Sequence, residues 1–331
     1  MDFVCFHTAD VVATDERSKT MTTICLNMIV KNESTVIKRC LDSVKAIIDY
    51  WVICDTGSTD NTREIVEECL KDIPGELHER PWVSFSHNRN ECLRLSRGKA
   101  DYLLFVDADM VANVYGDFKH KLEADSYLIR YEGVLDYYQQ MLVSSRHEWR
   151  YVGVTHEYIT SDTASIREKL PELTLTHFCD GGTRQEKFVR DIELLTKGLD
   201  DEPGNARYMF YLAQSYKDIG AHGRAIEWYD RRIEMGGWAE EVWYSMYQIA
   251  RMEGELGLPW RIVLDSFLRA YAYRPTRLEP LYQIALHYRK NGEYDLGYLF
   301  SKMGMEIPYP DDVLFIEKNV CQLPRHKWRS L

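Results

Sequence analysis

The sequence lacks the features of a membrane or nucleic-acid-binding protein. It contains no apolar run long enough to cross a bilayer, and no uninterrupted apolar core near the N-terminus that would predict a signal peptide. Lys and Arg together number 41 against 52 Asp and Glu, and the net charge of -11 argues against nucleic acid as the main partner. We therefore expect a cytoplasmic protein with no transmembrane segment.

Cysteine spacing argues against a zinc site. The eight cysteines are scattered, and no two of them form a C-x-x-C pair. Those expected on apolar faces of helices and strands are Cys25, Cys40, Cys54, Cys69 and Cys92. We predict that these five are reduced core residues, as is typical of a reducing, cytosol-like compartment.

The chain is long enough for two domains, with 331 residues of which 45% are hydrophobic and 28% charged. Its composition shifts near residues 180–182, and helical periodicity dominates from there. We predict an N-terminal arm over residues 1–20, an α/β domain over 21–182 and an all-α domain over 183–331.

Strands and helices alternate in the first domain. Apolar runs predict strands at 22–30, 50–54, near 77 and at 102–106, with helices between them at 36–48, 61–70 and 86–96. This alternation indicates a Rossmann-like parallel sheet with helices on both faces. Less regular sequence at 126–131, 140–145 and 149–159 predicts strands of a smaller mixed sheet.

Carboxylates follow two of these strands. Asp107 and Asp109 come directly after an apolar run and are spaced i, i+2, so extended backbone points both side chains the same way. Two hard oxygen ligands suit Mg²⁺ or Mn²⁺. Asp55 ends another strand, and open α/β sheets bind ligands at the carboxyl ends of their strands. The alternative is that each Asp only begins a solvated turn.

Four segments in this order resemble the family 2 glycosyltransferases, which have the nucleotide-diphospho-sugar transferase fold called GT-A. The segments are Ile-Val-Lys-Asn-Glu (29–33), Ile-Cys-Asp-Thr-Gly-Ser-Thr-Asp-Asn-Thr (53–62), Phe-Ser-His-Asn-Arg-Asn (85–90) and Leu-Phe-Val-Asp-Ala-Asp (104–109). The resemblance covers roughly residues 22–180. It implies a donor that is a nucleotide-diphosphate sugar, with a UDP-sugar as the expected case.

The resemblance also implies roles for individual residues. Asp55 matches the carboxylate that recognises the base, and a carboxylate accepts the imide N–H of uracil. Val30 and Glu33 would lie near the base, and Arg89 would face the nucleotide or its diphosphate. Asp107 matches the residue near the ribose and metal, and Asp109 matches the ligand of Mn²⁺ or Mg²⁺.

An inverting transferase needs a base that takes the acceptor proton. The segment Tyr151–Ile159 resembles a Gly-x-x-His-Glu stretch of relatives that carry helical repeats, and Glu157 is our candidate base, with Asp136 as second choice. The structural alternative for Glu157 is an ion pair with Arg146 or Arg150. His177 ends an apolar run, so it is either a ligand near the metal or a hydrogen-bonded structural residue.

The second domain resembles tetratricopeptide repeats. Alanines 213, 250 and 285 recur at about the repeat length of this motif, within helices rich in tyrosine. Stacked helix pairs form a concave face that suits a peptide or another subunit. We therefore expect the repeats to select a protein, peptide or glycan acceptor, or to form a homodimer.

These observations predict a metal-dependent, inverting glycosyltransferase with a C-terminal helical repeat domain. One alternative is a catalytically inactive GT-A relic that acts as a tetratricopeptide-type binding scaffold. A nucleotidyltransferase shares a related fold, but the glycine-rich, basic phosphate loop expected after its first strand is missing.

Overall fold

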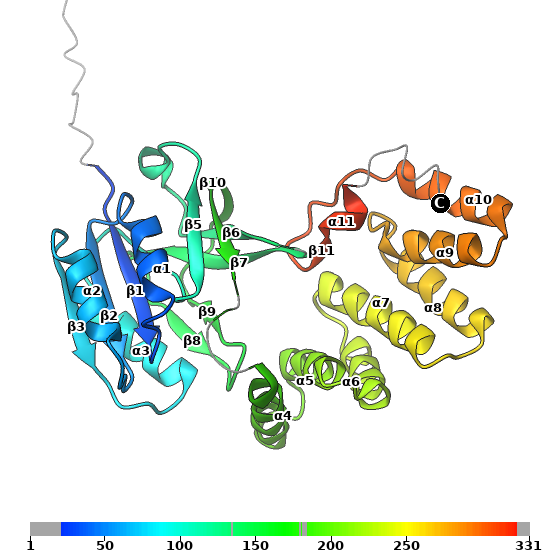
Figure 1. Ribbon diagram of the computed structural model, residues 1–331, viewed down its shortest axis with the longest axis horizontal. Coiled ribbons are helices and arrows are strands. Elements are labelled where there is room, and N and C mark those ends of the chain that lie inside the picture. Colours follow the sequence, from blue (N-terminus) through cyan, green and yellow to red (C-terminus); the bar gives the residue numbers. More distant parts are fainter. Residues whose placement is uncertain (1–20, 134, 179, 181–183, 323–331) are drawn as a thin grey trace, which may run out of the picture.

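The chain folds into a sheet domain followed by a curved array of helices (Figure 1). The computed structural model describes residues 21–133, 135–178, 180 and 184–322. The predicted N-terminal arm, residues 1–20, lies outside the described residues.

The main sheet of the described residues has nine strands. Its first half is parallel, in the order β3 (Gly75–Glu79), β2 (Tyr50–Asp55), β1 (Ile24–Val30) and β4 (Tyr102–Phe105). It continues through β7 (Leu135–Ser144), β6 (Ser126–Glu132), β10 (Arg167–His177) and β5 (Met110–Val114), in which only β6 and β10 pair in parallel. A 3₁₀ turn, Lys119–Lys121, follows β5. We predicted that β6 and β7 belong to a smaller mixed sheet, but they are part of the main sheet, because β7 pairs with β4 and joins its two halves.

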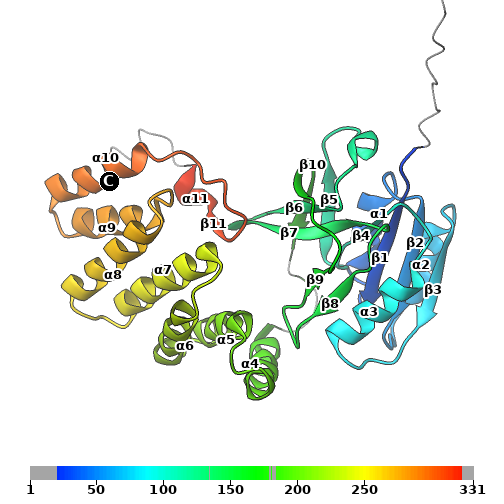
Figure 2. The same cartoon turned by 180° about the vertical axis from the view of Figure 1, so that it is seen from behind.

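Helices cover both faces of the parallel half, as predicted. α1 (Ile37–Val44) and α2 (Thr62–Leu70) contact each other, and α3 (Phe85–Leu95) packs on β1 and β2 from the other face (Figures 1 and 2). The core between them is apolar because the strands are buried on both faces. Four of the predicted core cysteines are buried and unpaired, and Cys69 is half-buried and unpaired.

A short antiparallel pair lies apart from the main sheet. β8 (Arg150–Val152) pairs with β9 (Tyr158–Thr160), and residues 153–157 form the loop between them. β8 contacts α3, which itself packs on β1 and β2 of the main sheet. The loop with Glu157 therefore lies close to the parallel half of that sheet.

The second domain consists of antiparallel helices, as predicted. Its helices are α4 (Arg184–Asp201), α5 (Ala206–Asp218), α6 (His222–Glu234), α7 (Ala239–Glu255), α8 (Trp260–Tyr273), α9 (Glu279–Lys290) and α10 (Tyr294–Met305). Each helix packs on the next, and the three repeat alanines are fully buried where helices approach closely.

The C-terminal segment, residues 309–321, returns from the helices to the sheet domain. β11 (Ile316–Glu317) pairs with β7, and α11 (Lys318–Cys321) follows it. Arg277, which is fully buried, holds this segment through Asp312 and the carbonyls of Leu314 and Phe315. The helical array therefore contacts the sheet domain at its far end as well as at its start (Figure 2).

Candidate functional site

The loops after β1 and β2 are locked together at the carboxyl edge of the sheet. The Val30 carbonyl accepts the Thr56 N–H at 2.9 Å, and the Glu33 N–H donates to Thr62 Oγ1 at 2.8 Å. Asn32 adopts a φ of 55°, which Asn tolerates better than most residues, and its Oδ1 accepts the Thr59 N–H at 2.7 Å. These hydrogen bonds join the end of β1 and the loop that follows it, with the predicted residues Val30 and Glu33, to the loop after β2.

One carboxylate oxygen of Asp55 accepts hydrogen bonds, and the other has no partner among the described residues. Its Oδ1 accepts the N–H groups of Gly57 and Ser58 at 2.9 and 2.8 Å, which sets the turn after β2. Its Oδ2 is buried and has no hydrogen-bond partner among the described residues. Because a buried carboxylate oxygen without a donor is costly, this atom is suited to accept an N–H from a ligand.

Arg89 joins two of the predicted site residues. Its Nη2 donates to Asp107 Oδ1 at 2.8 Å and its Nε donates to Glu157 Oε1 at 2.7 Å. The guanidinium is largely buried and also lies 5.4 Å from the Tyr151 ring. The pKa of Arg89 stays well above its ordinary value because Asp107, Tyr151 and Glu157 offset the cost of burial.

Glu157 does not pair with either of the arginines considered from the sequence. Arg146 bonds to the carbonyl of Glu123, and Arg150 pairs with Asp162. Glu157 instead lies 68 residues from its partner Arg89 in the chain. Its side chain is 11% exposed, so solvent or a bound molecule can reach it.

Asp109 and His177 meet across two antiparallel strands. Asp109 precedes β5 and His177 ends β10, and His177 Nε2 lies 2.9 Å from Asp109 Oδ2. A carboxylate and an imidazole are suitable ligands for Mn²⁺. Over the described ranges, however, no group of three or more His, Cys, Asp or Glu side chains is placed to hold a metal ion. Asp107 is directed to Arg89 instead.

Negative charge is concentrated beside these residues. Burial, together with the nearby carboxylates of Asp109 and Asp107, raises the pKa of Glu33 to about 7. A cation would offset the repulsion between these carboxylates and an approaching anion. Asp136, our second candidate base, lies elsewhere: it is 1% exposed and accepts the Tyr309 hydroxyl of the C-terminal segment at 2.9 Å.

Two further residues at this edge were not predicted from the sequence. Arg39 on α1 forms a two-bond ion pair with Asp180, at 2.8 and 3.0 Å, and its guanidinium lies 4.1 Å from the Phe178 ring. Asp180 is also one of the carboxylates that raise the pKa of Glu33. The pair joins residues 141 apart in the chain, so no local pattern could have found it.

Comparison with known proteins agrees with this geometry. Residues 25–187 match the family described as glycosyl transferase family 2. This range covers the sheet domain, including every residue of the carboxyl edge described above.

Curated relatives match both domains. The chain is 26% identical over 244 residues to the SPbeta prophage-derived glycosyltransferase SunS of Bacillus subtilis, an alignment that covers 67% of this chain and 56% of SunS. It is 25% identical over 260 residues to a TPR repeat-containing protein of Synechococcus elongatus, covering 72% of this chain and 63% of that protein. The chain thus spans little more than half the length of these relatives.

Solved structures of MamA are similar to a part of this chain. A crystal structure of MamA is 22% identical, has a TM-score of 0.32, and covers 37% of this chain and 70% of its own. Separately, none of the helices in the described part of the chain has the length and apolarity needed to cross a membrane.

Proposed function

Because residues 25–187 form a glycosyl transferase family 2 domain, we propose that the chain transfers a sugar from a UDP-sugar to a protein or peptide acceptor. The observation that carries this proposal is the partnerless buried Oδ2 of Asp55, at the same sheet edge as Asp107 and Asp109. Uracil presents an imide N–H that this oxygen can accept. Glu33 and the backbone around Val30 would border the base.

The acidic edge requires a cation before a diphosphate can bind. Asp107, Asp109 and Asp180 all lie close enough to raise the pKa of Glu33, and Arg89 is already shared between two carboxylates. Divalent cations of the Mg²⁺ type are commonly held by one or two carboxylates together with substrate phosphates, so a complete protein cage is not needed. Asp109 and His177 fit that role, with Asp107 beside them.

A divalent ion bound there would offset the charge that builds on the departing diphosphate. Family 2 enzymes generally use such an ion, and Mn²⁺ or Mg²⁺ suits this donor set. Asp107 is bonded to Arg89 at 2.8 Å, so Asp109 and His177 are the ligands in this proposal.

Glu157 is the base in this proposal. It would accept the proton of the attacking acceptor group, and the attack would invert the anomeric centre. Arg89 holds one of its oxygens at 2.7 Å, which leaves the other for the acceptor. Asp136 is a weaker candidate, since the Tyr309 hydroxyl and the surrounding chain bury it.

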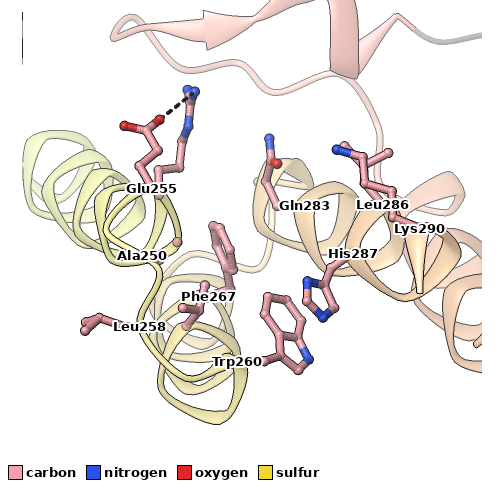
Figure 3. A pocket seen from close by; sticks show the side chains of 12 residues that line it. Ala250, Glu255, Leu258, Trp260, Phe267, Gln283, Leu286, His287 and Lys290 are labelled. Carbon is pink, nitrogen blue, oxygen red and sulfur yellow. Dashed lines mark ion pairs between the residues drawn. The ribbon is translucent and has the colours of Figure 1, made fainter.

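The helical domain offers a place for the acceptor. A cleft of about 380 Å³ lies between α7, α8 and α9 (Figure 3). Trp260 stacks on His287 at one side, and the indole Nε1 of Trp260 has no hydrogen-bond partner among the described residues. Arg251 and Lys290 also line the cleft, and Arg251 pairs there with Glu255 and with Glu317. Aromatic, donor and charged groups in one cleft suit a peptide segment.

Calorimetry with UDP in the presence and absence of Mn²⁺ tests the proposal. We expect binding that requires the metal, followed by slow hydrolysis of at least one of UDP-glucose, UDP-galactose and UDP-N-acetylglucosamine. The resemblance to a TPR repeat-containing protein favours a binding scaffold as the second candidate. An absence of UDP binding under both conditions would select the scaffold.

A further inference from the structure

The loop that carries Glu157 is held by the helical domain. Residues 153–157 lie between β8 and β9, beside α4 and α5 (Figures 1 and 2). The first hold comes from α4, where the buried carboxylate of Asp191 accepts the Thr155 hydroxyl at 3.0 Å. Val154 packs against the apolar cluster of α4 and α5.

The second set of contacts is made by α5, with His156, the residue next to Glu157. Arg207 donates from both Nε and Nη2 to the His156 carbonyl, at 3.1 and 2.9 Å. The His156 ring stacks on Tyr211, with the ring centroids 4.0 Å apart and an angle of 9° between the planes. Backbone and side chain of His156 are therefore both fixed by one helix.

The backbone at His156 needs such support. Its φ of 49° lies in the left-handed region, which a side chain with a Cβ adopts at a cost. Strained residues persist where their surroundings over-determine them. Here the two Arg207 hydrogen bonds and the ring stack supply that constraint. They thereby set the direction in which the Glu157 side chain points from the loop.

We propose that Arg207 and Tyr211 are positioning residues for Glu157, so that the first helices of the repeat domain complete the active site. The inference rests on the proposed function. The loop places Glu157 against Arg89, and Arg89 connects it to Asp107 at 2.8 Å. Without the hold from α5, His156 would relax to a common backbone conformation and Glu157 would leave the position that Arg89 now fixes.

Arg207→Met tests the hydrogen bonds, and Tyr211→Leu tests the stack. We expect kcat for hydrolysis of the best UDP-sugar to fall roughly 10- to 100-fold, with the KM for the sugar nucleotide and the affinity for UDP unchanged. Arg207→Lys keeps one donor for the His156 carbonyl and should recover part of the rate. Arg231→Met is the matched control, because Arg231 is exposed on α6 and its guanidinium lies over the Trp228 ring.

Two further measurements separate positioning from a merely structural role. In the double variant of Arg207→Met with Glu157→Gln, the rate should fall no further than in Glu157→Gln alone, since both changes disable the same base. Amide hydrogen exchange of residues 153–158 should increase in Arg207→Met and stay unchanged in Arg231→Met. Melting curves confirm that each variant is folded.

The outcomes distinguish this inference from the proposed function. Unchanged exchange of the loop in both α5 variants, or full kcat in a variant whose loop exchanges faster, would overturn the positioning role. Multiplicative losses in the double variant would overturn it too. A wild-type protein that neither binds UDP nor hydrolyses any donor would instead remove the proposed function, and with it the catalytic part of this inference.

Discussion

Replacing Asp55 by Asn changes one oxygen at the end of β2 into an NH₂ group. Oδ1 still accepts the N–H groups of Gly57 and Ser58, so the turn is kept. The partnerless Oδ2 becomes a donor, which cannot accept the imide N–H of uracil. A hydrogen bond to a charged group contributes about 1.5–3 kcal/mol, so the affinity for UDP should fall roughly 10- to 100-fold.

The same change should reverse the preference for the base. Cytosine has an acceptor nitrogen where uracil has the imide N–H, so the new amide should favour CDP. Stability should change by no more than about 1–2 kcal/mol, because weaker bonds to a neutral oxygen are offset by the removal of a buried charge. Calorimetry with UDP and CDP in Mn²⁺, on the wild type and Asp55→Asn, measures both effects. Equal UDP affinity in a folded variant would refute our assignment of Asp55.

Four other predictions address the base, the metal, the acidic edge and the C-terminal segment. Glu157→Gln should lower donor turnover by about 10²–10⁴-fold and leave UDP affinity unchanged in calorimetry; full turnover would reject the base. His177→Ala should raise the Mn²⁺ concentration for half-maximal hydrolysis at least about 10-fold, and an unchanged Mn²⁺ curve would exclude His177 as a ligand. The raised pKa of Glu33, about 7 against 4.5 in an unfolded chain, means that the folded state holds this proton more tightly. The free energy of unfolding should therefore fall as the pH rises from about 4.5 to about 7. Metal-free Glu33→Gln should melt roughly 2–4 °C above the wild type at pH 8 but not at pH 5. An equal difference in melting temperature at both pH values would contradict this. Arg277→Met leaves the buried carboxylate of Glu279 without its arginine partner and leaves Asp312 with Arg274 alone, so urea unfolding should show a loss of about 3–5 kcal/mol. A loss below about 1 kcal/mol would show that other contacts hold the segment.

The local part of this fold could be predicted from the sequence. Apolar runs of strand length followed by helical periodicity gave the parallel half of the sheet, and the carboxylates at its edge followed from strand direction. The place of β6 and β7 could not be predicted the same way, because the partner of a strand is decided by packing between distant segments.

Ion pairs show the same contrast between local features, which could be predicted, and contacts between distant segments, which could not. The sequence offered Arg146 and Arg150 as partners for Glu157, since both are near it in the chain, but Arg89 lies 68 residues away and holds it. The pair of Asp109 with His177 also spans 68 residues, and there the family resemblance had suggested Asp109 and the end of an apolar run had suggested His177. Residues 309–317 carried no periodic signal, so their return to β7 was missed.

The helical domain is attached to the sheet domain at both of its ends, so its length is fixed. At its start, α4 and α5 hold the loop before β9, and at its far end β11 adds to β7. A repeat protein with one free end can gain or lose a unit by extending into solvent. In this chain an additional helix pair would pull one attachment away from the sheet domain. We therefore expect related proteins of this architecture to differ in the length of their turns rather than in their number of helix pairs.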